Sequence, residues 1–292
     1  MKRILQTVIV ILICGLFSGC VRTNTDVQVA ATTAPIYEFT VRICNGTDIS
    51  VGQIITENVS CLHDYTLQTS QMRMIENAEL VVISGAGLED FMQDTLGSSQ
   101  TVIDASASIP LLCSESDHAH QHEEHAHAHD PHIWLSPDNA AQIARNICDG
   151  LKNAYPQHAD QFDANLLTLL TELSTLSAYG KEQLQSLSSR QLITFHDGFA
   201  YFADAFDLEV LYAIEEESGS EAPASELIEI CQTIEAYKIP AVFTEQNGST
   251  SASAIISAET GVSVYQLDMA ISGNGYFPAM YNNIYAIKEA LE

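Results

Sequence analysis

Histidine is concentrated in one short stretch, residues 117–134, which reads DHAHQHEEHAHAHDPHIW. Seven of the chain's ten histidines fall within this stretch, and only His63, His158 and His196 lie elsewhere. Imidazole is the commonest protein ligand for transition metals, and at pH 7 it is largely neutral and able to bind them. The six histidines before His132 therefore predict an auxiliary metal-binding loop: His118, His120, His122, His125, His127 and His129. A solvated low-complexity loop without a specific role is the alternative.

Further metal-competent side chains stand where predicted strands end. They are His63, His196, Glu245 and Asp268. Ligands of open α/β sheets bind at the carboxyl ends of strands, so these residues are candidates for one site. A lone histidine there is more often a hydrogen-bonded structural residue, and a lone aspartate is commonly a helix N-cap. Several together favour a metal site, but they lie too far apart in sequence for a zinc finger, which uses close ligand pairs.

Strand and helix patterns alternate in both halves of the chain. The continuous apolar run at residues 80–83 is typical of a buried parallel strand. The other predicted strands cover residues 27–31, 101–104, 191–195, 208–214, 241–244 and 262–267, and a β-branched run covers 49–59. Helices are predicted over residues 70–78, 198–206, 224–237, 252–260 and 277–291. This alternation predicts an α/β protein with parallel sheets.

A long helical region separates the two halves. Residues 138–155 and 157–187 carry helical patterns, and Pro156 between them suits the first turn of a helix. A helix of about 30 residues is ~45 Å long, enough to span a small protein. We therefore predict a rigid connector at 137–189, between an N-terminal lobe (21–136, with the histidine-rich loop at 117–132) and a C-terminal lobe (190–292). The alternative is two ordinary helices broken near Gly180.

The N-terminus has the pattern of an export signal. Two basic residues precede an apolar run, residues 4–17, which is too short for a comfortable transmembrane helix and fits a secretory signal. The small residues before Cys20 resemble a bacterial lipoprotein cleavage site, with Phe17 in place of the usual leucine. That resemblance implies a signal peptide over residues 1–20 and lipidation of Cys20. An uncleaved anchor would give the same extracytoplasmic, membrane-tethered topology.

Composition limits the class of partner. With 292 residues, 46% of them hydrophobic and 17% charged, the chain is globular and long enough for one or two domains. Its net charge of −27 argues against nucleic acid or an anionic membrane as a binding surface. The seven cysteines include no C-x-x-C pair, which argues against a cysteine zinc cluster or a thioredoxin-type site.

Several motifs resemble those of the metal-binding solute-binding proteins of ABC importers, in order along residues 27–292. The most specific is DPHIWLSP at 130–137; the others are His63-Asp64-Tyr65, AELVV at 78–82, FHDGF at 195–199 with Tyr201-Phe202, and Leu267-Asp268. In that family two α/β lobes joined by a long rigid helix hold the metal between them. The resemblance implies four metal ligands: His63, His132, His196 and Asp268.

The residue at position 196 helps to distinguish the metal. Manganese-binding members of the family usually carry glutamate where His196 stands. Three imidazoles and one carboxylate suit tetrahedral zinc, whereas Mn²⁺ prefers more oxygen ligands. The histidine-rich loop also resembles the zinc-specific branch. We therefore expect Zn²⁺, with manganese or another divalent metal as the alternative, and we expect Glu245 to support a ligand rather than bind the ion.

These expectations favour a binding protein over an enzyme. We expect capture of extracytoplasmic zinc and its delivery to the membrane permease of an ABC transporter, by a lipid-anchored monomer. A zinc hydrolase would need an open coordination position and a general base. Glu245 or Asp197 could serve as that base, but there is no H-E-x-x-H motif and Asp268 would fill the fourth position. A metal buffer without a permease partner is the third interpretation.

Overall fold

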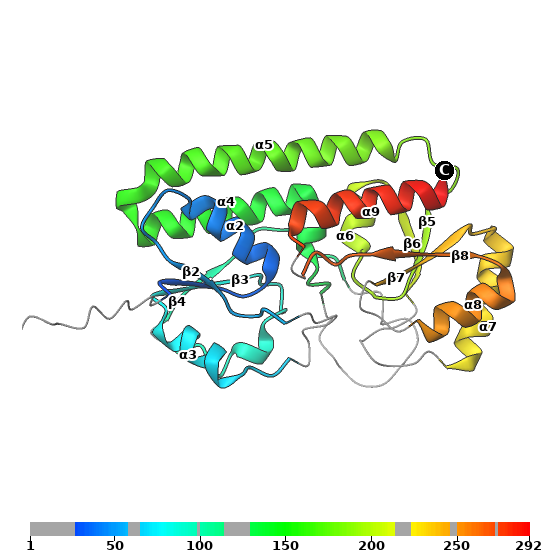
Figure 1. Cartoon of the computed structure of the whole chain (residues 1–292), viewed down its shortest axis with the longest axis horizontal. Coiled ribbons are helices and arrows are strands. Elements are labelled where there is room, and N and C mark those ends of the chain that lie inside the picture. Colours follow the sequence, from blue (N-terminus) through cyan, green and yellow to red (C-terminus); the bar gives the residue numbers. More distant parts are fainter. Residues whose placement is uncertain are drawn as a thin grey trace, which may run out of the picture.

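The protein consists of two α/β lobes that lie side by side along its long axis (Figure 1). The computed structural model describes residues 27–57, 65–97, 100–113, 129–213, 223–245, 250–271 and 274–292. Cys20, His63 and the loop histidines up to His127 lie outside these residues. Each lobe has a four-stranded parallel sheet, which confirms the predicted fold class.

The sheet of the N-terminal lobe has the strand order β2-β1-β3-β4. Its strands are β1 (Val29–Ala31), β2 (Val51–Gln53), β3 (Leu80–Ile83) and β4 (Thr101–Asp104). The helices α2 (Ala34–Cys44) and α4 (Pro137–Ala154) lie on one side of this sheet, and α3 (Thr69–Asn77) lies on the other (Figure 1). Helix α2 was not predicted, and β2 is much shorter than the β-branched run that contains it.

The C-terminal lobe repeats this topology. Its strands are β5 (Gln191–Thr194), β6 (Glu209–Ala213), β7 (Ala241–Glu245) and β8 (Ser263–Leu267), in the order β6-β5-β7-β8. Its helices are α6 (Ala200–Ala205), α7 (Ala224–Tyr237), α8 (Ser251–Thr260) and α9 (Tyr276–Leu291). All eight elements agree with the predicted bounds to within two residues. In both sheets the chain reverses its direction of travel between the two central strands, which creates a topological switch point.

One long helix, α5 (Ala159–Gln183), runs along both lobes (Figure 1). It follows a short 3-10 turn, η5 (Pro156–His158), and its 25 residues correspond to a length of about 37 Å. Gly180 lies inside the helix, where a Cβ atom would collide with the ring of Phe206. The glycine therefore allows close packing against the C-terminal lobe. The prediction of a rigid connecting helix is confirmed, and the alternative of a helix broken near Gly180 is wrong.

A single apolar core continues from one lobe into the other. It includes Phe39 and Trp134 together with Phe202 and Tyr276 from the C-terminal half. A second, smaller cluster fills the space between the C-terminal sheet and helices α7 and α8. Because most of the apolar side chains belong to the shared core, the two lobes are held in a defined relation to each other.

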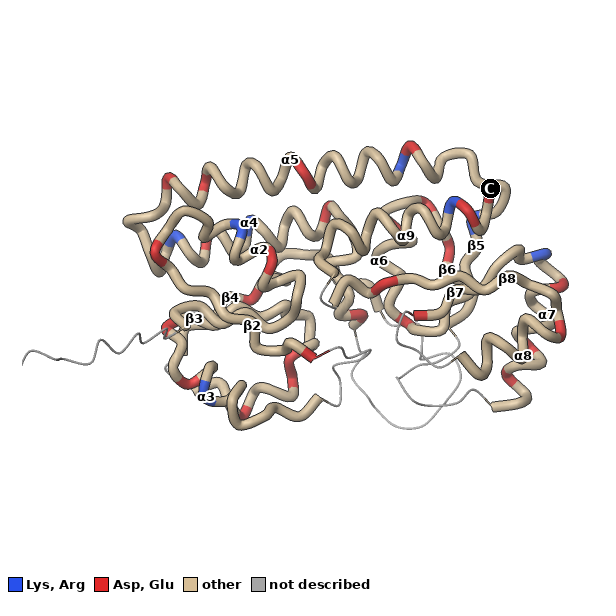
Figure 2. Tube along the Cα trace, viewed as in Figure 1, with Lys and Arg blue, Asp and Glu red and all other residues tan. Residues whose placement is uncertain are grey.

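Acidic side chains are spread over both lobes and outnumber basic ones (Figure 2). This distribution agrees with the strongly negative net charge, and the few basic residues of the described part of the chain are scattered along the tube. Within that same part of the chain, none of the helices combines the length and the apolar character needed to cross a membrane.

Candidate metal centre

Two imidazoles that lie 64 positions apart in the sequence meet in the interior. The Nε2 atoms of His132 and His196 are 3.2 Å apart, and the two rings meet edge to face with their centroids 4.9 Å apart. Both side chains are buried, with 5% and 4% exposure. In a tetrahedral zinc site with Zn–N bonds of about 2.0–2.1 Å, two nitrogen ligands lie about 3.3–3.4 Å apart. The observed separation therefore fits two ligands of one ion.

A carboxylate faces the other ring nitrogen of each imidazole. Asp130 Oδ1 lies 2.8 Å from His132 Nδ1 and also accepts the His132 backbone N–H at 2.9 Å. Glu245 Oε1 lies 3.2 Å from His196 Nδ1. Carboxylates in this position keep the proton on Nδ1, orient the ring and leave Nε2 as the metal-binding atom. Glu245 thus lies beside His196, and its predicted supporting role stays a prediction, whereas Asp130 was not singled out from the sequence.

The topology of the C-terminal sheet explains why His196 and Glu245 meet. His196 comes two residues after β5, and Glu245 is the last residue of β7. These are the two central strands, so both side chains stand at the switch point where α/β sheets bind ligands. Close by, a Cβ atom at Gly198 would lie 2.7 Å from His196 Cδ2 and 3.0 Å from His132 Nδ1. The absence of a side chain there gives the two rings the space to approach.

The corresponding switch point of the N-terminal lobe is filled by a buried carboxylate. Glu89 accepts hydrogen bonds from Thr32 Oγ1 at 2.6 Å, from Ser84 N at 2.7 Å and from Gly85 N at 3.0 Å. Thr32 directly follows β1 and Ser84 directly follows β3. Burial raises the pKa of Glu89 to about 7. Glu89 and its three donors therefore occupy the edge of this sheet where an α/β fold would bind a ligand.

The segment that carries His132 is fixed to the C-terminal lobe by hydrogen bonds of its neighbour, Trp134. The indole Nε1–H donates to the Met269 carbonyl at 2.8 Å, and the Trp134 carbonyl accepts from the Tyr276 hydroxyl at 2.9 Å. Tyr276 N–H in turn donates to Glu38 Oε2 on α2 at 2.7 Å. These bonds, of which the two made by Trp134 are buried, connect elements of both halves around the histidine pair and restrict its geometry.

Asp268 is held close to the end of β8 by a different set of contacts. Asn283 on α9 accepts from the Asp268 backbone N–H at 2.8 Å and donates to its carbonyl at 2.7 Å. The Asp268 carboxylate accepts from Ala270 N at 2.8 Å through Oδ1. Within the described residues, no three histidine, cysteine or carboxylate side chains gather closely enough to hold a metal. The structure thus brings together His132 and His196, and the assignment of Asp268 stays a prediction.

Most of the predicted histidine-rich loop lies outside the described residues. Only His129 is described, and it is exposed and forms an antiparallel bridge with Cys113. The other loop histidines lie outside the described residues, as His63 does; they are His118, His120, His122, His125 and His127.

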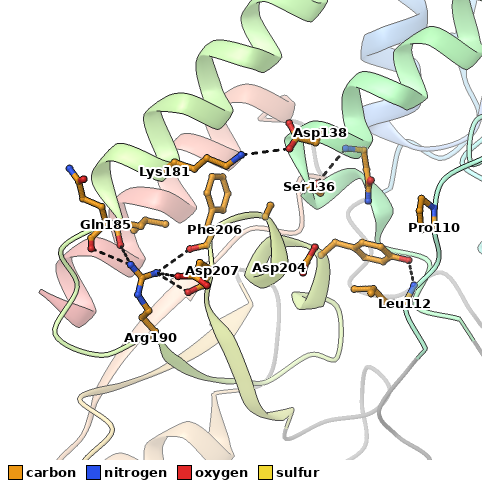
Figure 3. Close-up of a pocket in the computed structure, with 14 residues that line it drawn as sticks. Pro110, Leu112, Ser136, Asp138, Lys181, Gln185, Arg190, Asp204, Phe206 and Asp207 are labelled. Carbon is orange, nitrogen blue, oxygen red and sulfur yellow. Dashed lines mark hydrogen bonds and ion pairs between the residues drawn. The ribbon is translucent and has the colours of Figure 1, made fainter.

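A separate cavity of about 610 Å³ lies between the ends of α4, α5 and α6 (Figure 3). Its two cationic side chains are already engaged. Lys181 Nζ lies 3.7 Å from Asp138 Oδ2, and Arg190 contacts both Asp207 and backbone carbonyls that include those of Leu184 and Phe206. This cavity therefore offers no unpaired cation to an anionic ligand and contains none of the predicted metal ligands.

Comparison with known proteins identifies a single family over nearly the whole chain. The profile of the family described as ZnuA, zinc-uptake complex component A, periplasmic, matches residues 29–290. The zinc-binding lipoprotein AdcA of Streptococcus pneumoniae is 26% identical over 300 residues, which cover 96% of this chain. AdcA is longer, and the chain spans 60% of its length.

Solved structures agree with this result. A crystal structure of ZnuA superposes with a TM-score of 0.79 at 28% identity and covers 91% of this chain and 100% of its own. The Zn(II)-bound ZnuA-like domain of Streptococcus pneumoniae AdcA superposes with a TM-score of 0.76 at 26% identity, covering 91% of this chain and 99% of its own.

Proposed function

The chain belongs to the ZnuA family of periplasmic zinc-uptake components, and from this premise we propose that it captures Zn²⁺ outside the cytoplasm and delivers it to the permease of an ABC importer. The observation that carries the proposal is the buried pair His132–His196, whose Nε2 atoms face each other at 3.2 Å. Zinc is the cargo. Its capture requires reversible coordination by side chains, and no covalent bond of the protein is made or broken.

We assign the ligands as His63, His132, His196 and Asp268. The two central imidazoles supply the spacing of a tetrahedral site, and Asp130 and Glu245 keep their Nε2 atoms available. Asp268 follows β8, the strand next to β7, at the same carboxyl edge of the sheet as His196. Nitrogen-rich coordination favours zinc over Mn²⁺, which is the closest alternative cargo.

A binding protein suits this site better than a hydrolase. The candidate base Glu245 is buried and faces His196 Nδ1 at 3.2 Å, so it supports a ligand. Four protein ligands would also leave no open coordination position for an activated water. The same proposal places the protein on the outer side of a membrane, lipidated at Cys20 and working as a monomer with its permease. The proposal also divides the mature chain into an N-terminal lobe, residues 21–136, and a C-terminal lobe, residues 190–292.

Zinc titration against a competing chelator tests the proposal on the full chain in detergent. We expect one tight site that is lost in His196→Ala and retained in His158→Ala. The control removes a surface histidine whose Nε2 lies 3.0 Å from Asp48, so it changes an imidazole–carboxylate pair remote from the centre. An equal loss of zinc affinity in both variants, or tight binding that persists in His196→Ala, would contradict the proposed site.

Two further arms of the titration separate the alternatives. Deletion of residues 117–129, which keeps His132, is expected to leave the tight site in place. If tight binding disappears with the loop, the chain is a histidine-loop metal buffer. A repeat with Mn²⁺ decides the cargo, since a tetrahedral, nitrogen-rich site should bind zinc far more tightly.

A further inference from the structure

Residues 130–134, here called the ligand span, carry His132 and are held at both ends by tyrosine hydroxyls of the C-terminal lobe. Two residues before His132, the Asp130 carbonyl accepts from the Tyr201 hydroxyl on α6 at 3.1 Å. Two residues after it, the Trp134 carbonyl accepts from the Tyr276 hydroxyl at the start of α9 at 2.9 Å. Both tyrosines are buried, so both bonds are shielded from water. The imidazole therefore sits at the centre of a short span that the opposite lobe fixes at two points.

A contact of the ligand span with the N-terminal lobe leads back to one of these tyrosines. Asp130 N–H donates to the Leu112 carbonyl at 3.0 Å. Leu112 N–H donates in turn to the Tyr201 hydroxyl at 2.9 Å. One hydroxyl thus binds both chain segments. His132 precedes the connecting helix in the sequence, but it is positioned by the lobe that follows that helix.

Helix α9 also holds the backbone of the predicted ligand Asp268. Tyr276, its first residue, donates to Trp134, whose indole N–H donates to the carbonyl of Met269 at 2.8 Å. Asn283 on the same helix binds the backbone N–H and carbonyl of Asp268 at 2.8 and 2.7 Å. Positions 276 and 283 are seven residues apart, which puts them on one face of a helix and about 10 Å apart along its axis. This one helix, which starts near the middle of the molecule and ends at the C-terminus (Figure 1), therefore fixes the spacing between the aspartate and the ligand span.

The histidine pair is in this way built on one lobe. His196 follows β5 of the C-terminal lobe, and its Nε2 lies 3.2 Å from that of His132. We propose that Tyr201 and Tyr276 are positioning residues of the zinc centre, which make His132 part of the C-terminal lobe and hold it beside His196 before zinc arrives. This inference rests on the proposed function. Of the four assigned ligands, His63 alone then belongs to the N-terminal lobe.

A preformed pair of ligands raises the affinity for zinc. Ordering a side chain and its backbone at the moment of binding costs free energy, and this cost lowers the affinity. Ligands that hydrogen bonds already hold in place avoid it. Loss of either tyrosine hydroxyl leaves a buried carbonyl without this donor and lets the ligand span shift. The ordering cost then returns with each zinc ion that binds.

Removal of the two hydroxyls tests the proposal on the full chain in detergent. We expect Tyr201→Phe and Tyr276→Phe each to lower zinc affinity about tenfold in competition with a chelator, as for other partners of metal-binding histidines. Tyr155→Phe is the matched control, because it removes a hydroxyl that donates to Glu79 at 2.9 Å, next to the amino end of β3. Zinc affinity within about twofold of the wild type in either test variant, or an equal loss in the control, would overturn the proposal.

The absorption spectrum of bound cobalt distinguishes positioning from general destabilisation. One equivalent of Co²⁺ fills the tight site, and its visible absorption is strong in a tetrahedral site and weak at higher coordination number. We expect the band to lose intensity in Tyr201→Phe and Tyr276→Phe and to stay unchanged in Tyr155→Phe. A merely structural loss would lower thermal stability and leave the spectrum of the bound ion as it is, and that result would contradict a positioning role.

Amide hydrogen exchange tests the preformed pair without zinc. His132 N–H donates to Asp130 Oδ1 at 2.9 Å, and Leu135 N–H donates to the His132 carbonyl at 3.2 Å. We expect these amides to exchange slowly in the zinc-free wild type and in the control, and about tenfold faster in both test variants. Fast exchange in the zinc-free wild type that slows only when zinc is added would show that zinc itself orders His132, and it would overturn the proposal.

The two proposals fail in different ways. If the proposed function is wrong, the wild type has no tight zinc site that depends on His196. If only the positioning role is wrong, the wild type keeps such a site and the tyrosine variants keep it as well.

Discussion

Replacing Asp130 with asparagine isolates the contribution of the carboxylate that holds His132. The variant keeps the size of the side chain and an oxygen that can accept from the His132 backbone N–H. In the wild type this N–H donates to Asp130 Oδ1 at 2.9 Å. It removes the negative charge 2.8 Å from Nδ1, and its amide can present N–H to that nitrogen instead. Either change weakens the preference for the ring orientation and tautomer in which Nε2 binds metal.

The expected loss is 10- to 100-fold in zinc affinity, about 1.4–2.7 kcal/mol, the range found when a carboxylate behind a metal-binding histidine is removed. Competition with a chelator measures it, and circular dichroism checks that the fold is intact. Asp48→Asn is the matched control, since it removes the carboxylate 3.0 Å from the surface histidine His158. If Asp130→Asn binds zinc within twofold of the wild type, or if the control loses as much, the argument for Asp130 is refuted.

Three further predictions concern stability. The folded pKa of Glu89 is about 7, against 4.5 ordinarily. Between pH 5 and pH 8 the wild type should therefore lose about 2.5 kcal/mol of unfolding free energy relative to Glu89→Gln, as urea titrations at both pH values would show. Trp134→Phe leaves the buried Met269 carbonyl without its donor and should cost about 1–3 kcal/mol in urea unfolding. Gly150→Ala would drive a methyl group into Ile103 and should lower thermal stability by about 1–3 kcal/mol, whereas Gly97→Ala meets no neighbour and should not.

The sign of the Glu89 effect follows from its raised pKa. A buried carboxyl group that is easier to protonate in the folded state than in the unfolded state stabilises the fold below its unfolded pKa, and this contribution is lost as the pH rises through about 7. A difference between the two proteins that is independent of pH would contradict the assignment.

Apolar periodicity predicted most elements because it records burial directly. The run Leu80–Ile83 is a central parallel strand, and the helical pattern after Pro156 continues through Gly180. Helix α2 was missed because its sequence, APIYEFTVRIC, is rich in β-branched and aromatic residues that favour strands in isolation. Packing of its buried face, which includes Ile36 and Phe39, makes it helical, and that contact is not visible in local sequence.

The residue types of the candidate site could be predicted from the sequence, but the contacts between them could not. Residue type and position after a strand identified His196 and Glu245, because switch points lie where strands end. Their approach to His132 depends on how the two halves pack, and no local pattern encodes it. Asp130 could have been found from its place two residues before His132, where a side chain can fold back to the imidazole. Glu89 left no comparable signal, since its partners follow two different strands.

Trp134 gives the molecule an optical property that follows from its position. It is the only tryptophan in the chain, its side chain is 1% exposed, and its ring meets that of His132 edge to face with centroids 5.4 Å apart. Indole emission from the whole protein therefore arises beside one candidate ligand. Without any attached dye, its intensity and wavelength report the state of the centre, so arrival and departure of the cargo can be followed in real time with the unmodified protein.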